Sequence, residues 1–200
     1  MNYYLGIALA FVALLTWGIG DFLIQRSTRR IGVWETLFWN AFAATVILFP
    51  FIFRQLQQLT VVSGAFTLLV GLSIVVLFAA LFNFTALKEG KIAIVEPIQG
   101  IELPITIALA VGLVGERLTA AQFLLMGIVF IGIVFAVTVS AEHIRYPRRI
   151  LERGVLFAGL GAVSMALMNF LVGVSSQRIS PLLTLWFFSC FCFRYIHMAD

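Results

Sequence analysis

A repeat within the chain restricts its fold more than any other feature of the sequence. Residues Gly6–Leu37 return without a gap as Gly154–Leu185, displaced by 148 positions. Nine positions carry the same residue in both copies, and in the first copy they are Gly6, Ala10, Phe22, Leu23, Ser27, Arg30, Ile31, Thr36 and Leu37. Five apolar spans fill one period, and an odd number of membrane crossings turns the second copy upside down. The repeat therefore predicts two inverted structural halves with a binding site where they meet.

The composition indicates an integral membrane protein, with the lipid bilayer as its partner. Hydrophobic residues form 62% of it and charged residues 11%, and its mean hydropathy is +1.08. A soluble domain is about 45–50% apolar and about 25% charged, so a water-soluble fold could not bury this much apolar surface. The net charge of +4 comes from Lys and Arg in short loops, which argues against a nucleic-acid-binding face. Cys190 and Cys192 fit no zinc spacing, and no cofactor is predicted.

Seven apolar segments are predicted to be membrane spans, and a full crossing takes about 20 helical residues. We predict them at 4–24, 32–53, 61–84, 92–114, 119–140, 154–174 and 181–196. The chain then divides into a first five-helix repeat (1–140), an inter-repeat cytoplasmic loop (141–153) and an incomplete second repeat (154–200). The predicted fold class is an all-α integral membrane protein of inverted five-helix repeats, with about two helices of the second repeat present. We expect a multi-pass protein of the plasma (inner) membrane.

Loop charges predict the orientation of these spans. The loops after odd-numbered spans hold Arg26, Arg29, Arg30, Lys88, Lys91, Arg145, Arg148, Arg149 and Arg153. The loops after even-numbered spans hold only Arg54, Arg117 and Arg178. Because cytoplasmic loops are enriched in Lys and Arg, we predict that the odd-to-even loops are cytoplasmic and that the N-terminus is outside.

The seventh span departs from the repeat near its end. Up to Phe187 it follows the first copy, but Ser189–His197 then replaces the aliphatic run that Ala41–Leu48 predicts. Arg194 falls where the bilayer interior is expected. A second repeat of full length needs roughly another hundred residues. We therefore expect an incomplete molecule, truncated or changed in reading frame near Phe188; the alternative is that seven helices are the whole design.

Four acidic residues lie within the predicted spans, where a charge is costly enough to mark a functional candidate. Asp21 and Glu35 lie near the basic loop after the first span, and pairing with its arginines is the favoured interpretation of both. Glu96 lies about one turn into the fourth span. Glu102 lies about halfway across, so it is the first candidate for a substrate or proton pathway.

The segment around the last two acids predicts an interrupted helix. Glu96–Pro104 holds two prolines, a glycine and Gln99. Proline removes an amide donor, and irregular backbone in a membrane is tolerated only where protein or a watery cavity satisfies it. We therefore predict that this span lines a cavity, with Glu96, Gln99 and Glu102 on the pathway. Six residues turn a straight helix by about 240°, so both acids reach one cavity only if the helix bends. Alternatively, one acid pairs with a neighbouring helix and the other faces water.

Trp17 and Asn40 complete the predicted pathway. Trp17 is too deep in its span for the interfacial aromatic belt, so it either walls a cavity or packs between helices. Asn40 lies within the second span, where interhelical hydrogen bonding is the commoner role of asparagine. The sequence has no HExxH metalloprotease motif and no Gly-Lys-Ser/Thr phosphate loop. Neither catalytic residues nor metal ligands are predicted.

The end of the first repeat carries a series of landmarks in a fixed order. They are Pro104, Gly115–Thr119, and Leu124–Ile128 followed by Gly132, with Thr16–Gly18 and Leu87 earlier in the chain. This series resembles the drug/metabolite transporter superfamily, and within it the ten-helix EamA-like family. The resemblance covers one whole repeat and the first part of a second. It implies a ten-helix inverted-repeat carrier of small metabolites or drugs that works by alternating access. It also implies a cytoplasmic N-terminus, against the charge count.

The resemblance favours a secondary transporter with a small-molecule substrate. We expect this chain, with its incomplete second repeat, to be inactive by itself. One alternative is a non-transporting membrane subunit with a structural or assembly role. A membrane-embedded enzyme is less favoured, because no nucleophile, metal set or acid pair shows a recognisable geometry. Besides lipid and substrate, the sequence leaves a homodimer open as a partner.

Overall fold

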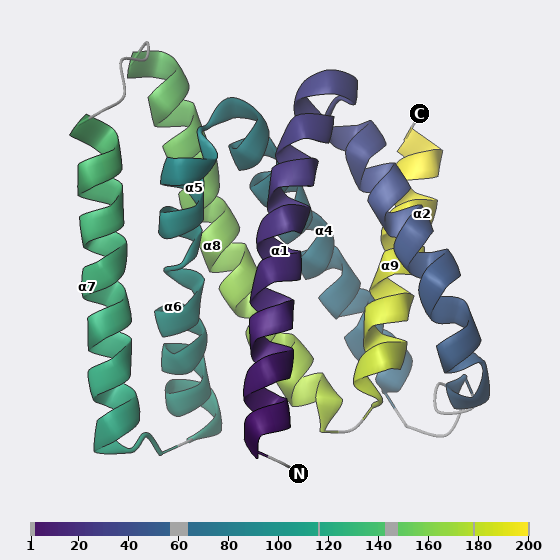
Figure 1. The fold of residues 1–200 in the computed structure, drawn as a ribbon. Coiled ribbons are helices and arrows are strands. Elements are labelled where there is room, and N and C mark those ends of the chain that lie inside the picture. Colours follow the sequence, from purple (N-terminus) through teal and green to yellow (C-terminus); the bar gives the residue numbers. More distant parts are fainter. Residues whose placement is uncertain (1–2, 57–63, 116, 143–147, 178, 200) are drawn as a thin grey trace.

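A computed structural model describes residues 3–56, 64–115, 117–142, 148–177 and 179–199. These residues form helices joined by short connectors, and no strand occurs among them (Figure 1). In chain order the helices are α1 (Tyr3–Ile31), α2 (Val33–Ile52), η1 (Phe53–Gln55), α4 (Ala65–Glu89), α5 (Ile92–Gln99), α6 (Glu102–Leu109), η2 (Ala110–Val114), α7 (Ala120–Glu142), α8 (Arg148–Ser176) and α9 (Pro181–Ala199).

Every predicted span corresponds to a helical segment. Five segments are both long and apolar enough to cross a bilayer: Tyr4–Ile31, Val33–Ile52, Phe66–Glu89, Ile92–Val114 and Arg153–Ser176. Two shorter apolar helices, Ala120–Phe135 and Pro181–Ile196, fall within the described residues of the other two spans. The prediction of an all-α membrane protein is confirmed.

Several helices extend beyond the predicted spans. Helix α1 continues to Ile31 and α4 to Glu89, past the apolar stretches that marked the spans. The predicted inter-repeat loop 141–153 is also shorter, because α7 ends at Glu142 and α8 begins at Arg148; the rest of that loop lies outside the described residues. Hydropathy marks the bilayer core, whereas polar residues of good helix propensity continue the helix into the interface.

Equivalent helices of the two predicted repeats run in opposite directions. In Figure 1, α1 starts at the lower end of the molecule and α8 at the upper end, and α2 and α9 are likewise antiparallel. An inverted repeat requires this arrangement. A two-fold axis in the membrane plane, with Asp21 equivalent to Asn169, stays a prediction.

Helices α4 and α8 form the most extensive contact between elements. A stripe of small residues at four-residue spacing lies along α8 and is buried, and it consists of Gly154, Ala158, Ala162 and Ala166. The hydrophobic effect does not drive helices together within lipid. Small residues instead let the backbones approach closely, and the van der Waals contacts of this packing stabilise the helix pair. This contact joins the first predicted repeat to the second.

Helix α9 packs along α2 through aromatic side chains. Phe193 lies with its ring centroid 5.0 Å from that of Phe38 and 5.5 Å from that of Phe42. The indole Nε1 of Trp186 donates a hydrogen bond of 3.1 Å to the carbonyl oxygen of Thr45. The unusual end of the seventh span therefore continues α9, and its Cys192 is buried.

The fourth span is interrupted, as its prolines and glycine predict. Helix α5 ends at Gln99 and α6 begins at Glu102. Pro104 has no amide to donate to the carbonyl of Gly100, and that carbonyl accepts instead from the amide of Leu103 at 3.3 Å. A Cβ atom on Gly100 would lie 3.1 Å from Cδ1 of Ile133, so the glycine also lets α7 approach.

The turn into α7 is closed by a capping box. The amide of Gln122 donates to Oγ1 of Thr119 at 3.3 Å, and the Thr119 amide donates to Oε1 of Gln122 at 2.8 Å. Such reciprocal bonds satisfy amides that a helix start leaves unpaired. Thr119 therefore caps α7.

Candidate functional site

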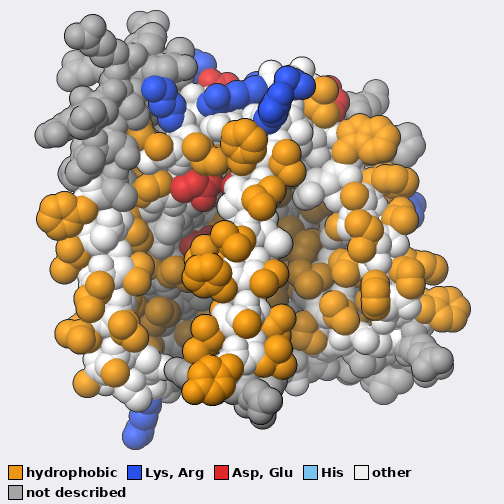
Figure 2. Space-filling model, viewed as in Figure 1, with side chains coloured by type: hydrophobic (Ala, Val, Ile, Leu, Met, Phe, Trp, Pro, Cys, Tyr) orange, Lys and Arg blue, Asp and Glu red, His pale blue; other side chains and the backbone are white. Residues whose placement is uncertain are grey.

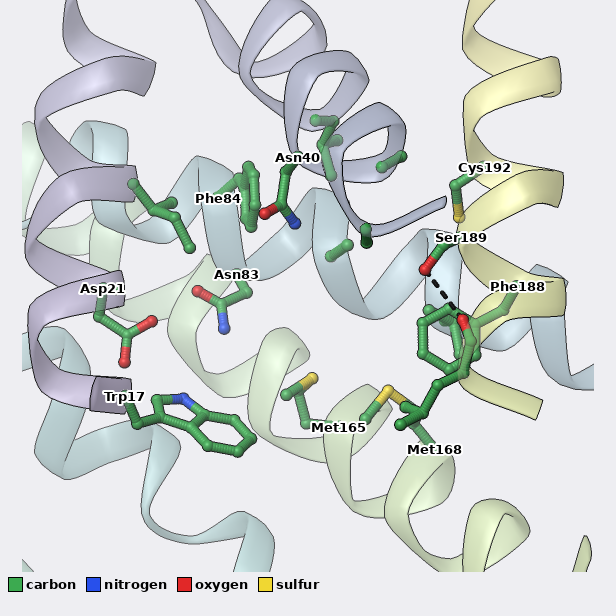
Figure 3. A pocket seen from close by; sticks show the side chains of 18 residues that line it. Trp17, Asp21, Asn40, Asn83, Phe84, Met165, Met168, Phe188, Ser189 and Cys192 are labelled. Atoms are coloured by element: carbon green, nitrogen blue, oxygen red, sulfur yellow. Dashed lines mark hydrogen bonds between the residues drawn. The ribbon is translucent and has the colours of Figure 1, made fainter. Parts of the chain in front are cut away.

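A cavity of about 430 Å³ lies between helices of both predicted repeats. Helices α1, α2 and α4 line it from the first repeat, and α8 and α9 from the second (Figure 3). Its lining includes Trp17, Asp21, Asn40, Asn83, Met165 and Phe188. The cavity thus occupies the place where the internal repeat predicts a site.

Asp21 is the acidic residue of this lining. Its side chain is 7% exposed and points from α1 toward the cavity (Figure 3). The predicted pairing of Asp21 and Glu35 with the loop arginines is wrong, because neither acid makes an ion pair with the arginines among the described residues. The Nε atom of Arg29 donates instead to the carbonyl oxygen of Lys88 at 3.2 Å. Asp21 lies farther from the end of α1 than these arginines do. A carboxylate inside the bilayer is costly unless a partner compensates its charge.

Two asparagines add amide groups to the cavity. Asn40 comes from α2 and Asn83 from α4 (Figure 3). The Oδ1 atom of Asn83 is buried and has no hydrogen-bond partner within the described residues. An unpaired polar group inside a membrane protein costs several kcal/mol (about 2–7) unless water or a ligand satisfies it. Among the described residues, this atom has no such partner.

The other walls are apolar. Trp17 covers the cavity beside Asp21, while Met165 and Met168 of α8 and Phe188 of α9 face them from the second repeat (Figure 3). Methionine is flexible and adapts to ligands of irregular shape. A cavity of this size with apolar walls and a few convergent polar groups is typical of a small-molecule site.

The predicted pathway residues divide into two groups. Trp17 and Asn40 line the cavity, whereas Glu96, Gln99 and Glu102 of α5 and α6 do not belong to its lining. The cavity expected along the fourth span is thus lined by other helices, because α5 packs against α7 and α8, and α6 packs against α8.

Glu96 and Glu102 are nevertheless within electrostatic range of Asp21. The charges of Glu96 and Glu102 both interact with that of Asp21, and that of Glu96 also with Glu102. Oε1 of Glu96 and Nε2 of Gln99 are buried without a partner among the described residues. Figure 2 shows acidic side chains in a recess beside α1, below a rim of Lys and Arg. Asp21 therefore lines the cavity and also lies within electrostatic range of the two acids on α5 and α6.

The groups that line the cavity are suited to binding a small molecule. Within the described part of the chain, no group of three or more His, Cys, Asp or Glu residues could hold a metal ion. The Ser189 hydroxyl at the cavity edge donates to the carbonyl oxygen of Leu185 at 2.9 Å. Sequence reasoning missed Met165, Met168 and Phe188, because an apolar residue in a membrane span gives no sign of whether it faces lipid or a cavity.

The comparisons with known proteins agree with the architecture. The model of the EamA-like transporter family matches residues 4–138. No match was found among the curated proteins or among the solved structures. The match spans α1 to α7 and takes in Trp17, Asp21, Asn40 and Asn83 of the cavity. The chain belongs to the EamA-like transporter family.

Proposed function

We propose that this protein is a secondary transporter that carries a small molecule by alternating access through the cavity of Trp17, Asp21, Asn40 and Asn83. The observation that supports it best is the position of the cavity, because helices of both predicted repeats line it. In an inverted-repeat carrier the two halves rock around a site between them. Its volume of about 430 Å³ is that of a site for a small metabolite or drug.

The lining suggests the class of substrate. A buried carboxylate at Asp21 selects a cationic group, and the side chains of Asn40 and Asn83 add hydrogen-bonding amides to the lining. Trp17 and Phe188 offer aromatic surfaces that favour an apolar body or a cation against a ring. We propose a small amine with an apolar portion as the substrate.

Glu96, Gln99 and Glu102 form the second part of the proposal. They surround the break between α5 and α6, and Glu96 and Glu102 interact electrostatically with Asp21. Carboxylates within a membrane bundle often form proton relays. We propose that these residues conduct the proton that drives the carrier, while Asp21 faces the substrate.

The charge distribution supports an orientation. Lys and Arg side chains gather at the end of the molecule where α1 ends, called the basic end here (Figure 2). The positive-inside rule places this end in the cytoplasm. We propose a multi-pass protein of the plasma (inner) membrane with its basic end inside.

The experiment that tests the function is counterflow in liposomes that contain the purified protein. A small amine should exchange across these liposomes, and filling the cavity should stop the exchange. Ala44 lines the cavity, whereas its neighbour Ala43 is exposed on the outer face of α2. Ala44→Phe should therefore abolish counterflow, and Ala43→Phe should leave it intact.

The same assay separates the alternatives. A structural or assembly subunit would give no counterflow with any amine, although the protein is folded in the liposomes. A membrane enzyme would change the amine chemically, which chromatography of the recovered compound would show. Equal counterflow by Ala44→Phe and Ala43→Phe would reject the cavity as the transport route.

A further inference from the structure

Three arginines line a groove at the basic end of α1. Arg26, Arg29 and Arg30, with Gln25 and Phe22, enclose about 330 Å³. Their spacing of three and four residues places them on one face of the helix. All three arginines are exposed, and none of these residues lines the transport cavity. The groove is therefore a feature separate from the proposed substrate site.

One wall of the groove is held in place by hydrogen bonds to the end of α4. The Arg29 guanidinium donates to the carbonyl oxygens of Lys88 and Gly90, and Gln25 Nε2 donates to the carbonyl oxygen of Leu87 at 3.2 Å. These bonds satisfy carbonyls that a helix end leaves unpaired. They also fix Gln25 and Arg29 before any ligand arrives.

The other two arginines differ from Arg29 in their contacts. Neither Arg26 nor Arg30 makes a hydrogen bond or an ion pair with the described residues. Two guanidinium groups, each with forked donors suited to a phosphate, thus remain available beside a fixed wall. Their charge makes an anion the ligand of this groove.

The surface beneath the arginines is apolar and faces outward. Leu15 is 54% exposed, Ile19 61% and Phe22 51%, and these residues follow one face of α1 toward the groove. In a membrane-spanning helix such side chains contact acyl chains. The change from apolar side chains to arginines marks the depth at which lipid phosphates lie. A phospholipid has an anionic phosphate at the membrane surface and acyl chains below it. The groove matches this order, with arginines at the surface and apolar side chains below them.

We propose that this groove binds an anionic phospholipid, with its phosphate on Arg26 and Arg30 and its acyl chains along Phe22, Ile19 and Leu15. Basic pockets at the cytoplasmic surface of membrane helices commonly hold anionic headgroups. A soluble phosphate would use the arginines alone and gain nothing from the apolar face. The lipid uses both parts of the surface.

The test measures lipid binding by the full chain purified in a neutral detergent. Dioleoyl phosphatidylglycerol and dioleoyl phosphatidylcholine are titrated, and native mass spectrometry counts the bound lipids. Wild type should prefer phosphatidylglycerol. The double variant Arg26→Gln/Arg30→Gln should bind it roughly thirtyfold more weakly, since each cation near an anionic lipid contributes about a fivefold gain in affinity.

Controls separate this site from general charge and from misfolding. Arg117→Gln/Arg153→Gln removes the same charge from exposed positions outside the groove and should bind like wild type. Arg26→Lys/Arg30→Lys keeps the charge without the forked donors and should lose only part of the lipid affinity. A misfolded variant would lose all of it.

Two results would overturn the proposal. One is equal binding of phosphatidylglycerol by wild type and by Arg26→Gln/Arg30→Gln. The other is complete displacement of the lipid by inorganic phosphate at millimolar concentration, which would make the groove a site for soluble anions.

Discussion

Gly90 and Gly154 touch through their backbones, since a Cβ atom on Gly154 would lie 2.7 Å from the Cα atom of Gly90. Gly90 follows the last residue of α4, and Gly154 begins the buried stripe of small residues on α8. The contact holds α4 and α8, the helices with the most extensive mutual contact, together at the basic end. Neither position has room for a larger residue without a shift of backbone.

Gly154→Ala should destabilise the protein. The added methyl group meets backbone atoms rather than a flexible side chain, so we expect a loss of about 1–3 kcal/mol. Gly159→Ala is the matched control, because a Cβ atom there meets nothing within 4 Å. The control should be neutral or gain up to about 1 kcal/mol from helix propensity. Free energies of unfolding in mixed micelles measure both, and similar values for the two variants would contradict the contact.

Trp186→Phe tests the contact between α2 and α9. It removes the hydrogen bond from Nε1 to the Thr45 carbonyl but keeps an aromatic ring. We expect a loss of about 0.6–1.5 kcal/mol, the range of interhelical hydrogen bonds in membranes. Trp39→Phe serves as control, because Trp39 is 60% exposed and should lose less. The same unfolding assay measures both variants. A larger loss of stability in Trp39→Phe than in Trp186→Phe would contradict a stabilising role of this hydrogen bond.

Labelling of single cysteines tests the orientation. After Cys190 and Cys192 are replaced by serine, a cysteine at exposed Lys88 should react with a membrane-impermeant maleimide only from the cytoplasm. A cysteine at Leu118, 37% exposed in the turn before α7, should react only from outside. Reaction of the Leu118 cysteine from the cytoplasm would instead support the orientation that the family resemblance implies.

Glu102→Gln should separate substrate binding from its coupling to protons. Glu102 interacts with Asp21 but does not line the cavity, so amine binding should stay within about twofold of wild type. Uptake driven by a proton gradient should fall at least about tenfold, the effect of removing a group that transfers protons. Glu35→Gln, at an exposed position, should retain full uptake. Normal gradient-driven uptake by Glu102→Gln would leave that residue a structural role.

The helices were predictable from the sequence because their causes are local. Apolar length predicts a span, and Pro97, Gly100 and Pro104 predict the break between α5 and α6. Each signal depends on residues a few positions apart. The helix ends were less predictable, because α1 and α4 continue past their apolar stretches.

The site was only partly predictable because it depends on which helices meet. Trp17 and Asn40 were identified as isolated polar or aromatic residues within spans, and both line the cavity. Asp21 was misinterpreted, because its place in the sequence suggests the nearby arginines, whereas Arg29 bonds to the end of α4. Met165 and Phe188 reach the cavity through the packing of α8 and α9. No local pattern encodes that packing.

The binding of benzylamine by Asp21→Asn tests the central claim most directly. Benzylamine carries one cationic amine on a small aromatic ring, and radioligand binding to the purified chain in nanodiscs gives its dissociation constant. We predict that Asp21→Asn weakens binding at least about tenfold, because a hydrogen bond to a charged group contributes about 1.5–3 kcal/mol, while Glu35→Gln binds like wild type. Benzylamine binding that is equal in Asp21→Asn and wild type would contradict the claim that this cavity is the substrate site.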